Sequence, residues 1–252
     1  MNEKINQLKV DTLPAIIRES VRLFSGQLIT SLGQNLRSIT VVGSSLTEDF
    51  KPGGSDINTV VVLDKQALNS LKQIASMAKS ISRKKISPPL LMTASYIERS
   101  LDVFGIEFLD FQLTHRTILG DDPFANLTFE KKDVRLQCER ELKAILIRLR
   151  QGYIAAATNR KLVRDILIST SKGLSPLLRA MLWLKDTDRS PGTEQTFKKA
   201  AELFAINLDS IITVVRWRHE KMRLDESKTD KTFESLYSSV EQLAETVDKL
   251  EA

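Results

Sequence analysis

An α+β domain followed by an all-α helical bundle is the fold class that the sequence predicts, and three observations predict it. In the first 120 residues, short β-branched segments alternate with segments whose apolar residues recur every three or four positions. After the turn at Gly120–Pro123, the strand pattern stops. The rest of the 252-residue chain keeps the helical spacing. We therefore expect two domains, residues 1–125 and 126–252.

The elements of the first domain follow from the spacing of apolar residues. Leu13 to Leu32 carry one apolar helical face, and a β-branched strand over 38–42 stops at Gly43. A polar loop leads to a second strand over 59–63, which is followed by a helix over 68–78. Two further strands are expected over 90–92 and 106–111. Strands interleaved with helices indicate a sheet with helices packed on it.

The second domain shows helical spacing only. Helices are expected over 142–156, 174–182, 211–217 and 233–250. The last segment, from Phe233 to Leu250, repeats its apolar residues in strict three-four steps over less than three heptads. That length suits a helix of the bundle. The alternative is that this helix forms the seam between two copies of the chain in a homodimer.

Composition excludes several classes of protein. The hydrophobic share of 42%, with 10 Gly and 7 Pro, is that of a globular chain and not of a disordered or collagen-like one. The single cysteine, Cys138, can form neither an intrachain disulfide nor a cysteine-based zinc site, and a structural role is expected for it. The first residues carry no secretion signal, and no apolar run reaches about 18 residues. We expect a cytoplasmic protein with no membrane partner.

The positive charge is concentrated in one segment. Lys and Arg total 37 against 32 Asp and Glu, a net charge of +5 that is too small for a nucleic-acid coat, although a nucleic-acid partner is not excluded. Residues Lys131 to Lys172 hold 11 basic and 4 acidic side chains. The segment is either a solvated helix face or a wall that attracts a triphosphate or an anionic acceptor.

Two neighbouring motifs carry the chemistry. The first strand ends in Gly43-Ser44-Ser45, and such a strand-to-helix turn presents backbone N–H groups and hydroxyls to a phosphate. The second strand begins after Asp56 and Asn58, whose side chains leave the same face because they are two residues apart. Oxygen ligands beside a phosphate cradle suit Mg²⁺ bound to a nucleoside triphosphate (NTP). A third carboxylate, Glu107, is available on a neighbouring predicted strand.

These motifs resemble those of the nucleotidyltransferase superfamily, which includes DNA polymerase beta and the aminoglycoside nucleotidyltransferases. The superfamily pattern is a hydrophobic residue, Gly, then Gly or Ser, a gap of roughly ten residues, and an Asp-hydrophobic-Asp/Glu segment. Gly43-Ser44, the gap 45–55 and Asp56-Ile57 match it, and the pair Ser55-Asp56 is also typical. Residues 100–110 and 119–123 look like a subgroup of bacterial stand-alone proteins with a nucleotidyltransferase domain and a helical C-terminal region.

The resemblance implies Mg²⁺-dependent transfer of a nucleoside monophosphate (NMP) from an NTP to a hydroxyl acceptor, a small molecule or a protein. It implies that Asp56 binds metal and that Glu107 binds metal and helps to deprotonate the acceptor. Asp110 competes for the role of Glu107, but on the predicted strand it would lie on the opposite face. The residues implied to contact the nucleotide are Gly43, Ser44, Ser45 and Ser55.

One position departs from the superfamily motif. Asn58 stands where the second metal-binding acid belongs, and its amide supplies no negative charge to Mg²⁺. The alternative is therefore a catalytically inactive nucleotide-binding, regulatory or interaction protein on the same fold. Ordinary structural interpretations also stay open: a serine-capped turn at 43–45, a local cap at Asp56, a turn residue at Asn58 and a solvated edge charge at Glu107.

The remaining polar residues indicate no further chemistry. His115 and His219 lie far apart in the sequence without a ligand set, so zinc and histidine-based triads have little support. Asp121-Asp122-Pro123 is interpreted as a turn. The group from Arg216 to His219 suits either stacking on a base or one buried tryptophan with solvated flanks.

Overall fold

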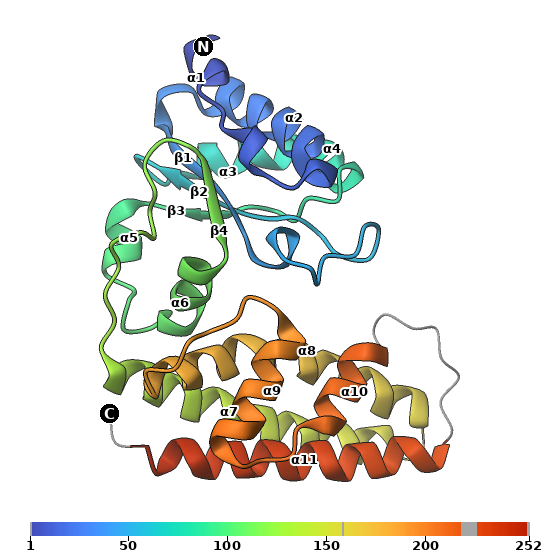
Figure 1. The fold of residues 1–252 in the computed structure, drawn as a ribbon. Helices are drawn as coiled ribbons and strands as arrows, with labels where there is room; N and C mark the ends of the chain where they lie inside the picture. Colours follow the sequence, from blue (N-terminus) through green and yellow to red (C-terminus); the bar gives the residue numbers. More distant parts are fainter. Residues whose placement is uncertain (1, 158, 218–225, 251–252) are drawn as a thin grey trace. The chain divides into compact units, whose positions relative to one another are not determined.

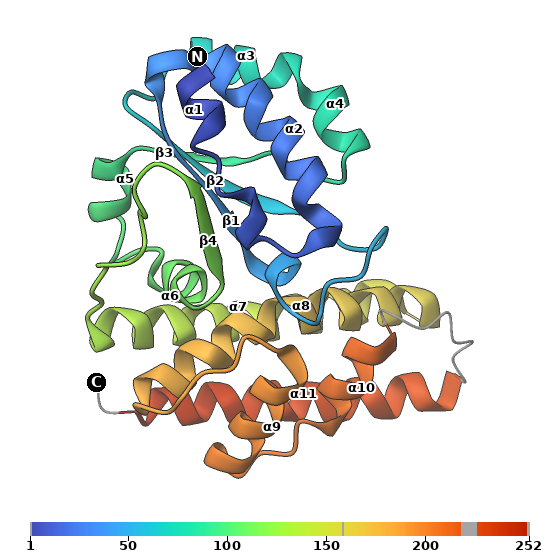
Figure 2. The same ribbon diagram turned by 45° about the horizontal axis from the view of Figure 1, so that its top comes forward.

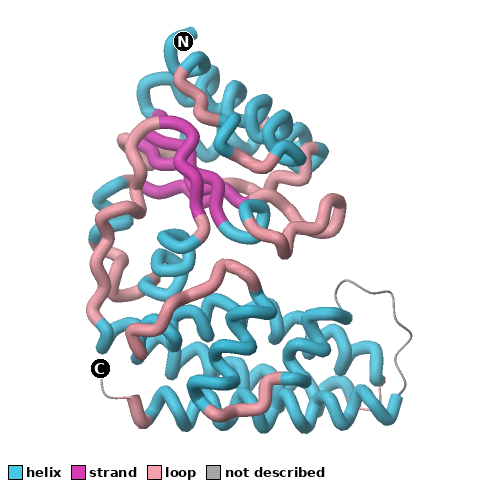
Figure 3. The backbone as a smooth tube through the Cα atoms, in the orientation of Figure 1, coloured by secondary structure: helices cyan, strands magenta, loops and turns pink. Residues whose placement is uncertain are grey.

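The computed structural model describes residues 2–157, 159–217 and 226–250 and divides the chain into two compact units. Unit 1 comprises residues 1–104 and 108–128, and unit 2 comprises residues 105–107 and 129–252. Within the described residues, the strands all belong to unit 1, as Figure 3 shows in magenta. These elements confirm the predicted α+β class. The prediction that residues 125 and 126 separate two independently folding domains stays a prediction.

Unit 1 is built on a four-stranded mixed sheet with the order β3-β2-β1-β4. The central strand β1 is antiparallel to both β2 and β4, and β2 is parallel to β3. The strands are β1 (Leu36–Val42), β2 (Asn58–Leu63), β3 (Leu90–Met92) and β4 (His115–Leu119). The helices are α1 (Asn2–Asn6), α2 (Ala15–Leu32), α3 (Leu68–Ser76), α4 (Ala78–Arg83), α5 (Ala94–Glu98) and α6 (Gly105–Leu113), with 3₁₀ turns η1 (Val10–Thr12), η2 (Gly33–Asn35) and η3 (Gly43–Leu46).

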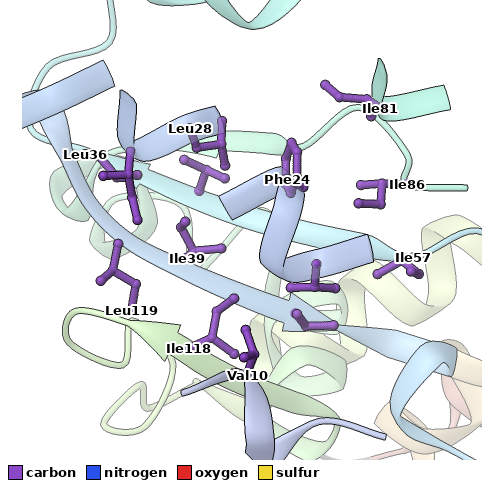
Figure 4. Close-up of a cluster of buried hydrophobic side chains, with 14 of the residues drawn as sticks. Val10, Phe24, Leu28, Leu36, Ile39, Ile57, Ile81, Ile86, Ile118 and Leu119 are labelled. Carbon is purple, nitrogen blue, oxygen red and sulfur yellow. The ribbon is translucent and has the colours of Figure 1, made fainter. Parts of the chain in front are cut away.

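The two faces of the sheet are covered by different helices. Alternate residues of β1 and β2, such as Ile39 and Val61, face a core shared with α2, α3 and α4. Figure 4 shows Phe24 and Leu28 of α2 lying over Ile39 in this core. Helices α5 and α6 lie on the other side of the sheet (Figures 1 and 2). Because both faces are covered, every residue of β1 except Arg37 is buried, including the polar Ser38 and Thr40.

Unit 2 is a helical bundle in its described residues. Its helices are α7 (Lys131–Ala156), α8 (Arg160–Leu184), α9 (Thr193–Phe204), α10 (Asp209–Trp217) and α11 (Glu226–Asp248). Helix α8 contacts each of the other four. The apolar seam of α11 packs on α7 and α8 of the same chain, and Leu236, Val240 and Leu243 are fully buried there. The three-four spacing of this helix is therefore satisfied inside the bundle.

Most of the predicted strands and helices are present, with one error that matters for the site. Residues 106–111 form helix α6 and not the predicted strand. Ile106, Phe108 and Leu109 are all buried, a spacing that a helix satisfies and an alternating strand does not. The sheet takes β4 in its place, which the prediction missed because that strand begins with the polar run His115-Arg116-Thr117. The predicted helix 68–78 is divided at Met77, and α9 was not predicted.

Candidate functional site

The candidate site lies in unit 1, at the end of the sheet where β1 stops and β2 begins. Val42, the last residue of β1, pairs with Asn58 on one side and with His115 on the other. Paired residues of neighbouring strands project from the same face of a sheet. Asn58, Val42 and His115 therefore form one row across three strands.

Asp56 and Asn58 are exposed, and the residues between and beside them are buried. Ser55, Ile57 and Thr59 are all less than 9% exposed. The alternation is fixed by the backbone of Ile57, whose N–H donates to the Lys85 carbonyl at 2.8 Å and whose carbonyl accepts from Ser87 at 3.0 Å. These bonds hold Ile57 in the core, where Figure 4 draws it, so its two polar neighbours face outward. The predicted shared face of Asp56 and Asn58 is present.

The turn η3 follows β1 and lies beside Asn58. Gly43 has a positive φ of 76°, a conformation that favours glycine, and its N–H donates to the Thr114 carbonyl at 2.9 Å. A Cβ atom at Gly43 would lie 3.9 Å from Nδ2 of Asn58. The carbonyl of Ser44 accepts hydrogen bonds from the backbone N–H and the hydroxyl of Thr47. The Gly43–Ser44 turn and Asn58 are therefore brought together, as the motif predicts.

Two of the predicted nucleotide-binding serines are buried. The hydroxyl of Ser45 has no hydrogen-bond partner among the described residues, and Ser45 is only 2% exposed. Ser55 is 7% exposed, and its hydroxyl accepts a long hydrogen bond of 3.5 Å from the backbone N–H of Lys51. In this conformation Ser55 closes the loop before Asp56, while Ser44 is the half-buried serine of the turn.

The predicted third carboxylate does not lie on the sheet. Glu107 is in the first turn of α6, and residues 105–107 belong to unit 2. The prediction that Glu107 and Asp110 occupy opposite strand faces is wrong, because residues three apart in a helix lie on the same side. Strand β4 carries no carboxylate, and in the row with Asn58 it places His115.

His115 is held at both ring nitrogens. Its Nδ1 lies 2.8 Å from the Phe111 carbonyl oxygen, and its Nε2 lies 2.8 Å from Oδ2 of Asp122. Burial works against ionisation of Asp122, but hydrogen bonds from His115 and from the Phe124 N–H outweigh it and lower the pKa of Asp122. Both ring nitrogens of His115 are therefore engaged within unit 1. The spacing of apolar residues does not predict this pair, whose members are seven residues apart across a turn.

The donor set fits one Mg²⁺ carried by a triphosphate better than it fits two metal ions. Asp56 offers a carboxylate and Asn58 an amide oxygen, and Mg²⁺ is commonly bound by one or two carboxylates together with substrate phosphates. In the described residues, no group of three or more His, Cys, Asp or Glu side chains is placed to hold a metal ion. A two-metal site needs more negative charge than these residues bring together.

One cavity of unit 1 lies elsewhere on the sheet. A cavity of about 1020 Å³ is lined by Leu36, Asp64, Thr93 and Gly120, at the opposite ends of the strands. Gly43, Asp56 and Asn58 do not line it. The candidate site is thus an exposed edge of the sheet.

The basic segment from Lys131 to Lys172 lies on α7 and α8, and much of its charge is paired within unit 2. Arg135 and Lys143 bind Glu139, Lys131 binds Asp186, and Arg160 binds Asp230 at 2.6 Å. These partners favour the interpretation that the cations balance acidic residues of the bundle. The tryptophan of the Arg216–His219 group, Trp217, is buried, and Arg218 and His219 lie outside the described residues.

Comparison with known proteins locates the fold. No family model and no curated protein sequence matches the chain. Among solved structures, the chain is similar to a spectinomycin adenyltransferase, AAD(9) from Enterococcus faecialis, whose crystal structure contains ATP and spectinomycin. The TM-score is 0.57 at 14% identity, and the match covers 88% of this chain and 98% of the other.

The chain has a nucleotidyltransferase fold. At 14% identity the likeness confirms the predicted fold, and the roles of Gly43-Ser44 and Asp56-Ile57 stay predictions. Coverage of most of both chains means that the nucleotidyltransferase fold includes helices from both units and not the sheet alone. Within the described residues, no helix has the length and apolar character needed to cross a membrane.

Proposed function

We propose a function for the end of the sheet formed by Gly43, Ser44, Asp56 and Asn58, which we call the Gly43–Asn58 edge. It binds a Mg²⁺-bound NTP and transfers its NMP group to a hydroxyl acceptor. The observation that carries the proposal is the juxtaposition of the glycine turn with the exposed Asp56 and Asn58, on a sheet with the nucleotidyltransferase fold. The similar solved structure is an adenyltransferase that contains ATP, which supports the same class of substrate here. A cytoplasmic location remains part of the proposal.

The residues of this edge have separable roles. Gly43 brings the backbone close to the phosphates without a side chain, and Ser44 adds a hydroxyl. Asp56 and Asn58 would hold Mg²⁺, which when bound neutralises the charge that develops on the phosphates. In the transfer, the acceptor oxygen bonds to the α-phosphorus, and the bond from this phosphorus to the bridging oxygen breaks, which releases pyrophosphate. The hydroxyl proton passes to a carboxylate, for which Asp110 of α6, which belongs to unit 1, is the candidate.

A second candidate function is nucleotide binding without transfer. Asn58 removes one negative charge, and the neighbouring strand offers His115 where a carboxylate would complete the site. Both differences weaken metal binding more than they weaken contacts between phosphate and backbone. A regulatory or assembly role would then use the nucleotide as a ligand.

Binding and transfer are separated by two measurements on the full chain. Titration of a fluorescent ATP analogue, with Mg²⁺ and with EDTA, measures binding, and transfer of label from α-labelled NTP to acceptor hydroxyls measures catalysis. We expect Asp56→Asn to weaken Mg²⁺-dependent binding by about 10-fold or more, as loss of a charged ligand does. The control is Asp64→Asn, which removes a carboxylate just beyond the other end of β2. Equal binding by wild type and Asp56→Asn would place the nucleotide elsewhere.

The change Asn58→Asp tests whether the missing negative charge limits Mg²⁺-ATP binding and NMP transfer at the site. Asn58 is exposed and lies beside Gly43, so a carboxylate there can approach the same cation as Asp56. We expect the variant to bind Mg²⁺-ATP more tightly and to transfer NMP faster than wild type. Tighter binding with no transfer by either protein would favour the binding function over the enzyme. An unchanged affinity would mean that this side chain does not meet the metal ion.

A further inference from the structure

Unit 2 contains a cavity of about 630 Å³ in the groove between α7 and α8, a volume within the usual range for small-molecule sites. Residues on one face of each helix line it, and the first turn of α6, which belongs to the same unit, closes one end. All of the residues that line the groove belong to unit 2.

The register of the two helices follows from one close approach. A Cβ atom at Gly152 of α7 would lie 2.8 Å from Cδ1 of Ile166 in α8, so these residues face each other. Because α7 ends at Ala156 and α8 begins at Arg160, the helices run antiparallel. Farther from the connection between the helices, Arg148 is level with Thr170, and Ile145 is level with Gly173. Glu141 lies about one turn beyond Ile145 and about two turns beyond Arg148, and it marks the other end of the groove.

Helix α8 contains two residues that destabilise a helix where it borders the groove. Gly173 is in the helix interior, and a Cβ atom there would meet nothing within 4 Å, so packing does not require glycine. Pro176, one turn later, lacks the N–H that would bond to the Lys172 carbonyl. Both residues are unfavourable in helix interiors, and both line the cavity. The missing side chain of Gly173 keeps the middle of the groove open.

The two ends of the groove differ in charge. At one end, the guanidinium of Arg148 and the hydroxyls of Ser169 and Thr170 line the cavity, and none of them bonds to any residue in the described part of the chain. At the other end are the carboxylates of Glu141 and Glu107. Glu141 is bound by Arg140 at 3.0 Å, in an exposed pair of the kind that contributes little.

The middle of the groove is apolar. Ile145 of α7 and Gly173 of α8 line it between the charged ends, while Ile166 lies at the Arg148 end and Leu177 at the Glu141 end. Glu141 and Arg148 are seven residues apart, about 10 Å along α7. A ligand that contacts both side chains therefore bridges about 10 Å along the helix, and the hydrogen bonds at its two ends take up part of that length.

We propose that the α7–α8 groove binds a small bipolar molecule with a carboxylate at the Arg148 end, an amine at the Glu141 end and an apolar chain between them. Arginine and hydroxyl donors recognise the carboxylate, and the two glutamates recognise the ammonium group. The isoleucines and Leu177 remove the apolar chain from water. An ω-amino acid has this chemistry and this span.

The test uses three probes that differ only in their end groups: ε-aminocaproate, caproate and n-hexylamine. Binding to the full chain is measured by chemical-shift titration without nucleotide. We expect saturable binding of ε-aminocaproate, and a dissociation constant about 10-fold or more higher for each probe that lacks one charge. Equal affinity for the three probes, or no saturable binding of ε-aminocaproate, would overturn the proposal.

Variants then locate the site. Gly173→Leu fills the groove and should abolish binding, and Arg148→Gln should raise the dissociation constant of ε-aminocaproate but leave that of n-hexylamine unchanged. Gly173→Ala should raise the thermal midpoint, because alanine favours the helix and meets no neighbour. The matched control is Gly26→Ala in α2, where a Cβ atom also has nothing within 4 Å and no effect on binding is expected. If folded Gly173→Leu binds ε-aminocaproate as wild type does, the groove is not its site.

Discussion

The pair His115–Asp122 should stabilise unit 1 in a way that depends on both charge and hydrogen bonding. Asp122→Ala removes two hydrogen bonds at once, since Oδ2 binds His115 Nε2 at 2.8 Å and Oδ1 accepts from the Phe124 N–H at 2.9 Å. The first bond is charge-assisted and would be worth about 1.5–3 kcal/mol if fully buried, and the second about 0.5–1.5 kcal/mol. The Asp122 side chain is 35% exposed, so solvent screening reduces the first figure. We expect a total loss of about 2 kcal/mol.

Asp122→Asn separates the two contributions. An asparagine keeps an oxygen for the Phe124 N–H and offers its NH₂ group to a neutral His115, so the geometry survives without the charge. We expect this variant to lose about 0.5–1 kcal/mol, and the thermal midpoint of unit 1 to fall by about 3–4 °C per kcal/mol in either variant. Circular dichroism melts measure both. The control, Asp121→Ala, changes the adjacent exposed carboxylate and should stay within about 0.5 kcal/mol of wild type.

The pH dependence of the same pair has a definite sign. The folded chain lowers the pKa of Asp122 below its ordinary value of 3.8, so the folded state binds this proton less readily than the unfolded state. The stabilisation is complete above pH 3.8 and is lost as the pH falls through the lower folded value. The difference between wild type and Asp122→Ala should therefore shrink as the pH falls below 3.8. A difference at neutral pH below about 0.5 kcal/mol, or one that does not shrink in acid, would refute the assignment.

Two other positions give further tests. Gly120 has a positive φ and its Cβ atom would overlap the Arg37 carbonyl oxygen, so Gly120→Ala should destabilise unit 1 by about 3 kcal/mol or more in a denaturant melt. Gly33 also has a positive φ but open space around it, so Gly33→Ala should cost only about 1 kcal/mol, and equal losses would contradict the steric argument. Burial, followed by the charge of Glu107, raises the pKa of the Cys138 thiol to about 12, so this thiol should resist a disulfide reagent at about pH 8 until the chain is denatured. Rapid labelling of the native protein would show that the thiol is accessible.

Local patterns were sufficient to predict the two strands that carry the candidate site. The β-branched runs before Gly43 and after Asn58 have few alternative structures, and the step of two residues determines which side chains share a face. That inference needed no knowledge of neighbouring strands. It placed Asp56, Ile57 and Asn58 correctly with respect to solvent and core.

The strand beside β1 on the other side of the site, β4, could not be predicted in the same way, because its identity depends on which segment joins the sheet. Residues 106–111 are short and apolar, and such a run fits a strand or a buried helix equally well. The segment is a helix because Leu109 is buried together with Ile106 and Phe108. The strand that does join the sheet begins at His115, whose ring is held by the Phe111 carbonyl before the strand and by Asp122 after the next turn. The spacing of apolar residues in the sequence does not predict a contact of that kind.

The chemistry of His115 explains why it cannot replace the missing carboxylate. It stands in the row with Val42 and Asn58, but both of its ring nitrogens are engaged, one with the Phe111 carbonyl and one with Asp122. A ring held at both nitrogens has no nitrogen left to bind a metal ion, and an imidazole supplies no negative charge to Mg²⁺. Asp56 therefore remains the carboxylate that this edge of the sheet offers. A negative charge added at position 58 is the change expected to strengthen metal binding most. For this reason the outcome of Asn58→Asp distinguishes a weakened transferase from a protein that only binds nucleotide.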